Sequence, residues 1–492
     1  MYKHTTVKKS LILLVAVLLC MSVLLAACSE KPHPTVDIPA KSTVESNGGV
    51  AVKYGDWIYY VNGYQSSVSA DNTYVDTTDS PRVGSVVRIE ASKIELALAE
   101  YDKDQTSTAR TKAIADIVRS NAQIVVPRIY YSGNTTSPEL NGIWIFNDRI
   151  YLLTPNDKLT ANGAARTSEA VLMSYDLGGG SEQRHFTFTS NAAQVWLYQN
   201  GNDIMATYLM NSELHVLKVG ATESASVDTL IADDEDNTTV SSVNFDVSEN
   251  SLGQGVYFLD SDGSICKLAK GATAKEVLVS NATANDEEST ITYTISSVSN
   301  GFVYFTKSDS DNSSVSGTVL YYTSSNDKVS EGGDLKVALN TSSVTTFGWK
   351  ENKVVTIRQT TSGYYGLFLI ENADGSDPIC LLLPGYNEDS ITIWKIDGND
   401  LYYTAGGVTY KKNLSEFVGD NPTGKSSQLG EAYSVTTMNS ASVGWALPDI
   451  VTVGEHTYVF TLSSGSVTVV EFDAVKKSNG SSVTLTLVAD ED

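Results

Sequence analysis

Apolar, strand-like segments alternate with turns rich in Gly, Asn and Asp along almost the whole chain. A turn and the segment after it form a phrase that recurs, with clear copies at Gly55-Asp56-Trp57-Ile58-Tyr59-Tyr60 and Gly398-Asn399-Asp400-Leu401-Tyr402-Tyr403. The eight copies occupy residues 55–60, 147–152, 202–205, 254–258, 300–305, 351–355, 398–403 and 454–459. Apart from a longer first gap, their spacing is roughly 50 residues, which is typical of a propeller blade.

One repeat contains four short candidate strands. In residues 141–190 these are 142–146, 149–153, 171–175 and 185–188, with a tight turn at Asp176-Leu177-Gly178-Gly179. Four strands per period, rich in Tyr, Val, Ile and Thr, predict a β-propeller blade. A single blade leaves its sheet faces uncovered, so the blades must stack into a closed ring. We therefore predict an all-β fold, a single β-propeller over residues 49–492 with eight blades; seven blades with one irregular blade is the competing arrangement.

Ring closure places the two ends of the propeller side by side. Strands near residues 50–61 must then lie next to the last repeat at residues 450–487. Only this contact removes the two open sheet edges that a stack of blades would otherwise expose.

The longer first gap is explained by a predicted helical insertion over residues 94–121. Its apolar stripe begins after Ser107 or Thr108, either of which is a suitable N-cap, and Asn121 is a stop signal. The stripe consists of Ala109, Ala113, Ile114, Ile117 and Val118. We expect this helix to pack against the propeller rim; a helix that binds a partner is the alternative.

The repeated phrase resembles that of a known group of propellers. Ile58-Tyr59-Tyr60 and Leu401-Tyr402-Tyr403-Thr404, together with the Asp-Gly turns, resemble the Tyr-Trp-Thr-Asp-type and TolB-like propellers. The chain is similar to bacterial lipoproteins that carry a propeller of unknown function related to the LDL-receptor type. This resemblance covers about residues 50–490 and implies the fold rather than an activity. No Trp-Asp dipeptide recurs and no double glycine keeps register, which argues against the WD40 and Kelch families.

The N-terminus has the pattern of a secretion signal. Lys3, Lys8 and Lys9 precede an apolar run at residues 11–24, and Leu25-Ala26-Ala27-Cys28 follows it. This ending resembles the lipobox of bacterial lipoproteins, which implies cleavage before Cys28 and attachment of diacylglycerol to its thiol. An uncleaved membrane helix is the alternative. We expect a signal peptide over residues 1–27, a flexible Pro-containing tether over residues 28–48 and a lipid-anchored protein on the extracytoplasmic face of the cell membrane.

The acidic net charge of the chain limits which classes of partner it can bind. The chain has 34 basic and 58 acidic residues, a formal net charge of −24, and loss of the three signal-peptide lysines brings it to −27. Such a surface repels phosphate backbones, so we expect no nucleic-acid partner. It also repels anionic lipid headgroups, so the acyl anchor must hold the protein at the membrane.

The four cysteines predict a lipid attachment site but no disulfide bond. Cys20 lies in the signal peptide and Cys28 is the predicted lipidation site. Cys266 and Cys380 lie far apart in segments that read as separate strands, so we expect no disulfide between them.

One segment matches the phosphate-loop pattern letter for letter, namely Gly419-Asp420-Asn421-Pro422-Thr423-Gly424-Lys425-Ser426. A phosphate loop requires a buried parallel strand before it and a helix after it. The preceding segment at residues 411–416 does not read as a buried strand, and the following one leads into a β segment. We predict a polar loop between strands, with Lys425 exposed and no bound nucleotide.

Candidate catalytic and metal sites are sparse. The mature histidines His33, His185, His215 and His456 have no zinc-protease spacing, and no nucleophile-elbow motif is present. Clustered carboxylates, which could bind calcium, occur at Asp260/Asp262, Asp309/Asp311 and Asp233-Asp234-Glu235-Asp236. None completes an EF-hand loop, and aspartates in turns usually cap their own backbone. We therefore assign no catalytic residue, no metal ligand and no cofactor.

Tryptophans suggest where the first strand of each blade runs. Trp144, Trp196, Trp349, Trp394 and Trp445 each precede a recurring turn. They either wedge between blades or form an aromatic ring near a channel mouth that stacks on sugars or peptide side chains. We predict a binding or scaffold module, not an enzyme, for a protein or envelope polymer; a surface hydrolase or lyase acting on glycans is the alternative. The ligand-binding residues cannot be named from the sequence.

Overall fold

The computed structural model describes residues 35–63, 83–128, 142–159, 161, 165–190, 193–232, 240, 243–245, 255–281, 290–330, 333–340, 345–434, 450–454, 456–463, 466–473 and 478–487. The signal peptide, Cys28, His33, Trp445 and the acidic run at residues 233–236 lie outside the described residues. None of the described helices is long and apolar enough to cross a membrane.

The described strands form eight antiparallel sheets, named A to H here in chain order. Sheet A contains β1 (Val44–Glu45), β2 (Ala51–Tyr54), β3 (Trp57–Val61), β4 (Val86–Glu90) and β5 (Gln123–Val126). Sheet B contains β6 (Trp144–Phe146), β7 (Arg149–Leu159), β8 (Ala165–Asp176) and β9 (Gln183–Phe188). Sheet C contains β10 (Gln194–Asn200), β11 (Asp203–Met210), β12 (Glu213–Lys218) and β13 (Val227–Ala232), with the 3-10 helix η4 (Glu223–Ala225) before β13. Sheet D contains β14 (Asn244–Phe245), β15 (Gly255–Leu259), β16 (Ile265–Ala269) and β17 (Glu276–Val279).

The second half of the chain repeats the same meander. Sheet E contains β18 (Ile291–Ser299), β19 (Phe302–Asp309), β20 (Ser316–Ser324) and β21 (Lys336–Leu339). Sheet F contains β22 (Thr346–Lys350), β23 (Lys353–Gln359), β24 (Tyr365–Ile370) and β25 (Ile379–Tyr386), followed by η6 (Glu388–Ser390). Sheet G contains β26 (Ile391–Asp397), β27 (Asp400–Ala405), β28 (Val408–Asn413) and β29 (Glu431–Ser434), with η7 (Leu414–Phe417) after β28. Sheet H contains β30 (Ile450–Val453), β31 (His456–Ser463), β32 (Ser466–Asp473) and β33 (Ser478–Thr484).

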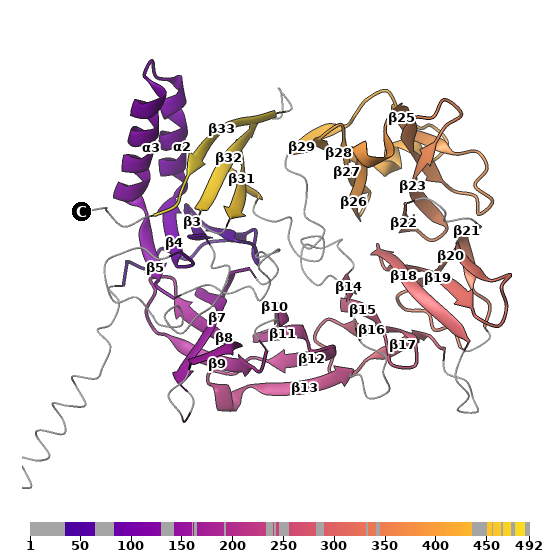
Figure 1. The fold of residues 1–492 in the computed structure, drawn as a ribbon, viewed down its shortest axis with the longest axis horizontal. Helices are drawn as coiled ribbons and strands as arrows, with labels where there is room; N and C mark the ends of the chain where they lie inside the picture. The colour runs from indigo at the N-terminus through magenta and orange to yellow at the C-terminus, as the bar shows by residue number, and fades with distance from the viewer. Residues whose placement is uncertain are drawn as a thin grey trace, which may run out of the picture.

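These sheets are the eight blades of a β-propeller, as predicted. Figure 1 shows them following one another round a ring, with the first strands of sheets C to G toward its middle. In sheets B to H the described residues of each copy lie in the second strand or in the turn that leads into it, whereas in sheet A the copy covers β3 and the turn between β2 and β3, because β1 comes first. Gly55, Gly398 and Gly454 each have a φ of 59° at this turn, a conformation that costs glycine no steric strain. The recurring phrase therefore predicted correctly both the number of blades and the position of a hairpin in each of them.

The ring closes between sheets A and H, so the prediction that the first and last repeats lie side by side is confirmed. Tyr60 Oη donates to the carbonyl of Leu485 at 2.9 Å. Asn62 donates through Nδ2 to the carbonyl of Leu487 at 3.0 Å and accepts from its N–H at 2.9 Å. In the described part of the chain, the strands of sheet A all come from its N-terminal end and those of sheet H from its C-terminal end, so side-chain packing and these bonds join the two blades.

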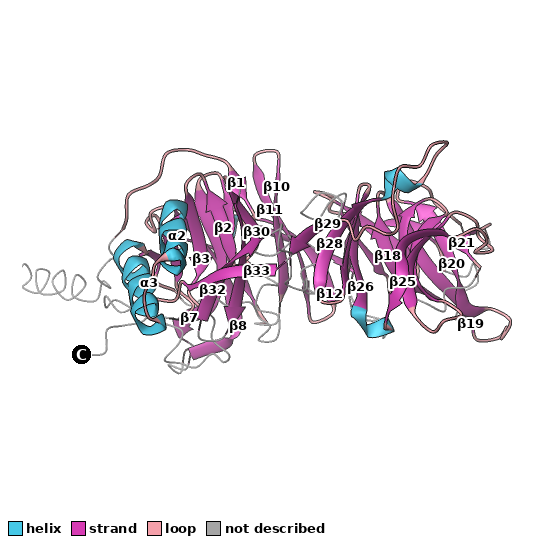
Figure 2. Cartoon of the chain, turned by 90° about the horizontal axis from the view of Figure 1, so that it is seen from above, coloured by secondary structure: helices cyan, strands magenta, loops and turns pink. Residues whose placement is uncertain are grey.

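The insertion in the first blade is a helical pair between β4 and β5: α2 (Ala91–Leu98), η2 (Ala99–Asp102) and α3 (Ser107–Asn121). Figure 2 shows both helices at one end of the molecule, beside sheet A. Ile114 and Val118 of α3 join the apolar core shared by sheets A and H, which confirms the packing role. The N-cap is Thr106, whose side chain accepts from Ala109 N, rather than Ser107 or Thr108.

Part of the segment predicted to be a flexible tether packs on the propeller. Over residues 35–48, Val36 N donates to the carbonyl of Gly178, and β1 pairs with β2 as a fifth strand of sheet A. The guanidinium of Arg88 donates to the carbonyl of Asp37 at 2.7 Å. The chain is thus attached to sheets A and B from residue 36 onward. The prolines and polar residues of this segment suggested flexibility, but its backbone groups find partners on the blades.

Candidate functional site

The tryptophans lie in first strands, as predicted: Trp144 in β6, Trp196 in β10, Trp349 in β22 and Trp394 in β26. Trp144, Trp196 and Trp349 are 3%, 2% and 2% exposed, so their rings are part of the packing between blades. Trp394 is half-buried, and its Nε1 donates to Thr404 Oγ1 at 2.7 Å. The three buried rings favour the structural interpretation over an aromatic ring at the channel mouth.

A buried Ser–His pair in sheet B does not have the surroundings of a catalytic site. His185 Nε2 lies 2.7 Å from Ser174 Oγ, and its Nδ1 lies 2.6 Å from the carbonyl of Gly220. Burial lowers the pKa of His185 below its usual value, which favours the neutral ring. Ser174 is 0% exposed, and both ring nitrogens of His185 are engaged within the protein. A substrate could not reach this hydroxyl, so the pair is structural.

The other described histidines bind neighbouring carboxylates. His215 stacks on Tyr208, with ring centroids 4.6 Å apart, and its Nδ1 lies 3.2 Å from Asp228 Oδ2. His456 Nδ1 lies 2.6 Å from Glu471 Oε1. The two histidines lie on different sheets, C and H, and so do not combine into one site.

The described carboxylate pairs have structural partners. Asp260 forms an ion pair with Lys275, and Asp262 Oδ1 accepts from Ser264 N at 2.8 Å. Asp309 Oδ1 accepts from the N–H of Asp311 at 3.0 Å. Among the residues that the structure describes, no three His, Cys, Asp or Glu side chains gather in a way that could hold a metal ion. Cys266 in β16 and Cys380 in β25 are free thiols in different sheets, as expected.

The segment that matches the phosphate-loop pattern is a loop between β28 and β29, and Lys425 on it is exposed, as predicted. The N–H groups of Thr423 and Gly424 donate to the carbonyl of Glu416, so they are not free to bind phosphate. A Cβ on Gly424 would lie 2.6 Å from the ring of Phe417. Packing against this ring therefore explains the second glycine of the pattern.

The residues before this loop correct one expectation. Residues 408–413 form β28, and Lys412 within it is only 6% exposed, although the segment did not read as a buried strand. Because β28 pairs antiparallel with β27 and the loop leads into a strand, β29, the requirements of a phosphate loop are still not met.

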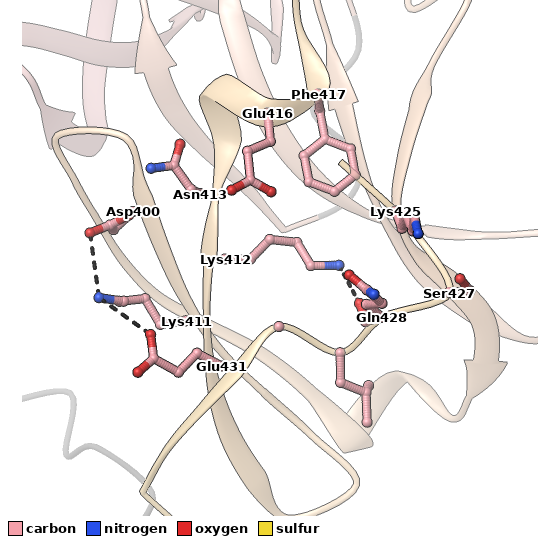
Figure 3. A pocket seen from close by; sticks show the side chains of 12 residues that line it. Asp400, Lys411, Lys412, Asn413, Glu416, Phe417, Lys425, Ser427, Gln428 and Glu431 are labelled. Atoms are coloured by element: carbon pink, nitrogen blue, oxygen red, sulfur yellow. Dashed lines mark hydrogen bonds and ion pairs between the residues drawn. The ribbon is translucent and has the colours of Figure 1, made fainter. Parts of the chain in front are cut away.

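A cavity of about 730 Å³ lies between β28, η7 and this loop, and we call it the sheet G pocket. It is lined by Asp400, Lys411, Lys412, Asn413, Glu416, Phe417, Lys425, Ser427, Gln428, Leu429, Gly430 and Glu431 (Figure 3). Its volume falls in the range of small-molecule sites. The sequence contained a signal for it, the adjacent Lys411 and Lys412, but their proximity to Lys425 depends on the fold.

Local interactions shape one wall of the sheet G pocket. Asn413 caps η7, and its Oδ1 accepts from the N–H of Ser415 at 2.9 Å. Leu414 and Phe417 of η7 are buried in the core of sheets F and G, which holds the short helix in place. This fixes Glu416, which is exposed, at the edge of the cavity.

The lysines of the pocket differ in their surroundings. Lys411 Nζ lies 3.9 Å from Asp400 and 3.7 Å from Glu431, so these three charges largely satisfy one another. Lys412 Nζ donates to the main-chain carbonyls of Leu381 in β25 and Gln428, the latter at 2.7 Å. The side chain of Lys425 makes no ion pair or hydrogen bond with any described residue. The pocket thus offers one unpaired exposed cation in a chain that is strongly acidic overall.

Comparisons with known proteins give distant likenesses. No family model matches the chain, and no curated protein matches it. Among solved structures it is similar to a puromycin hydrolase, with 11% identity and a TM-score of 0.31 over 71% of this chain and 54% of that one. It is also similar to apo AztD from Citrobacter koseri, with 11% identity and a TM-score of 0.29 over 64% of this chain and 91% of that one. A third similar structure is an oligogalacturonate lyase in complex with manganese, with 11% identity and a TM-score of 0.29 over 50% of this chain and 70% of that one. This chain spans about half the length of the puromycin hydrolase, and scores this low carry no argument for a shared activity.

Proposed function

We propose that this protein is a lipid-anchored, extracytoplasmic β-propeller that acts as a binding or scaffold module for a protein or an envelope polymer. The observation that carries the proposal is the sheet G pocket, where loops on a rigid blade present charges of both signs around a cavity of about 730 Å³. Function on a propeller lies in what such loops contact rather than in the fold itself.

The attachment of the N-terminal segment suggests how the protein is oriented. Cys28 precedes Val36, the first residue bonded to the blades, by eight positions, so a lipid on Cys28 would lie at most roughly 30 Å away. Sheets A and B would therefore lie close to the bilayer. In Figure 1 sheets E and F lie across the ring from sheets A and B, and sheet G lies between them and sheet H.

The anchor gives the first testable prediction. Cys28→Ala should leave the precursor without lipid and abolish its tight membrane attachment, because the thiol carries the diacylglycerol. Fractionation of cells and mass spectrometry of the N-terminus measure both effects. Cys20→Ala is the matched control and should leave lipidation intact. Membrane retention of Cys28→Ala, together with globomycin-insensitive processing of the parent, would show that the anchor is wrongly assigned.

The binding role predicts an effect of reversing the unpaired charge in the pocket. After crosslinking and pull-down from intact cells, followed by a glycan array if no protein is captured, Lys425→Glu should retain about tenfold less partner, equivalent to about 1.4 kcal/mol. Lys270→Glu is the matched control, since it changes the net charge equally at an exposed lysine outside the pocket. Equal retention by both variants would place binding elsewhere on the ring. Release of cleaved sugar from a captured glycan would instead favour the hydrolase or lyase alternative.

A further inference from the structure

Lys412 is a deeply buried lysine whose amine borders a cavity. It is 6% exposed, and in Figure 3 its side chain runs across the sheet G pocket toward Gln428. Its Nζ donates to two main-chain carbonyls and forms no ion pair with a described carboxylate. Lys395, which is also buried in sheet G, differs because its Nζ lies 3.2 Å from Asp397 Oδ2.

This arrangement suits a neutral amine. A neutral amine has two N–H groups, which the carbonyls of Leu381 and Gln428 satisfy, and one lone pair, which stays available. An ammonium group would carry a third N–H in a largely buried position. Burial lowers the pKa of Lys412 to about 8, while Cys380 and Glu416 act in the opposite direction. The Phe417 ring, with its centroid 5.3 Å from Nζ, gives the charged form modest additional support.

A second charged group lies on the side of the pocket toward which this amine extends. Lys425 and Gln428 lie there in Figure 3, and Lys425 has no carboxylate partner among the described residues. Lys425 and Lys412 line the same cavity, so one small ligand could contact both of them. Desolvated lysines of this kind are the ones that form Schiff bases in proteins.

We propose that Lys412 captures carbonyl compounds, specifically small aldehydes or 2-oxo acids that carry a carboxylate, as an imine in the sheet G pocket. The lone pair of Nζ attacks the carbonyl carbon, and the π electrons of the C=O bond move to oxygen, which takes the proton that the nitrogen gives up. The resulting carbinolamine loses water, so that one aldehyde and one amine give one imine and one water. The carboxylate pairs with Lys425. This inference goes beyond the binding role proposed above, because it assigns a small-molecule ligand to the pocket.

Reductive trapping tests the capture. The mature protein is incubated with glyoxylate and cyanoborohydride, digested, and mapped by mass spectrometry for carboxymethyl-lysine. We expect Lys412 to be labelled faster than Lys425 and Lys270, which are more exposed, with a rate that rises with pH to half its maximum near pH 8. Lys412→Arg keeps a cation and donors to both carbonyls but should lose the label, with its circular dichroism spectrum unchanged.

The role of Lys425 is tested by comparing two aldehydes. Lys425→Gln should slow glyoxylate labelling of Lys412 by about fivefold, the effect of one exposed ion pair, and should leave labelling by propionaldehyde unchanged. If Lys412 is labelled no faster than the exposed lysines at pH 8, the proposal is overturned, and Lys412 has only the structural role of linking sheets F and G through its hydrogen bonds. If Lys412→Arg still retains the polymer or protein partner in that case, the binding role stands and only the covalent capture fails. If Lys412 is labelled while no partner is retained, the binding role fails and the capture stands.

Discussion

A chain that ends at residue 440, before sheet H, is expected to lose cooperative folding altogether, not merely one blade's share of its stability. Sheets A and H share an apolar core with α2 and α3, in which the retained side chains Ile58, Tyr60, Val87, Ile89 and Ile94 are fully buried. Removal of sheet H uncovers this core, and each exposed aliphatic side chain costs about 1.5–3 kcal/mol. The sum over these side chains is comparable with the stability of about 5–15 kcal/mol that a folded domain has in total.

Equilibrium unfolding in urea, followed by fluorescence and circular dichroism, checks this prediction. Asn62→Ala in the full-length chain is a milder test of the same contact between sheets A and H, because it removes both bonds to Leu487 without changing chain length. It should lower the free energy of unfolding by about 2–4 kcal/mol, since it leaves a buried donor and a buried acceptor unsatisfied. A truncated protein that is monomeric and nearly as stable as the parent would mean that the seam between sheets A and H does not hold the ring together.

The number of blades could be predicted from the sequence because turn chemistry is local. Gly55, Gly398 and Gly454 occupy backbone conformations with positive φ, so the same residue types recur wherever the same hairpin recurs. The two apolar residues Ile114 and Val118 likewise revealed the buried face of α3, because helical periodicity is a property of neighbouring residues.

The sheet G pocket could not be predicted in this way. Lys412 lies in a strand whose end, Lys411-Lys412-Asn413, is polar, and only its packing against β25 shows that its side chain is buried. The packing of residues 35–48 escaped prediction for a related reason. The partners of Val36 and Asp37, Gly178 and Arg88, belong to sheets distant along the chain, and composition carries no information about such bonds.

Replacement of Asn300 is expected to loosen three blades at once. It lies at the hairpin turn of sheet E with a φ of 51°. Its Nδ2 donates to the carbonyl of Trp349 in sheet F at 2.9 Å and to that of Gly398, at the turn of sheet G, at 3.0 Å. One amide thus links the first hairpins of sheets E, F and G. Asn300→Gly keeps the backbone conformation accessible and removes these bonds, so we expect the free energy of unfolding to fall by about 1–3 kcal/mol.

Asn300→Ala should cost about 1 kcal/mol more than Asn300→Gly, because alanine also strains the left-handed backbone. Asn147 provides the matched control, since it has a φ of 50° at the equivalent turn of sheet B but its Oδ1 accepts only from the exposed Gln199 at 3.3 Å. Asn147→Ala should carry the same backbone cost relative to Asn147→Gly, whereas Asn147→Gly itself should be close to neutral. Urea unfolding of the four variants separates the two contributions. If Asn300→Gly proves no more costly than Asn147→Gly, the convergence of sheets E, F and G does not depend on this amide.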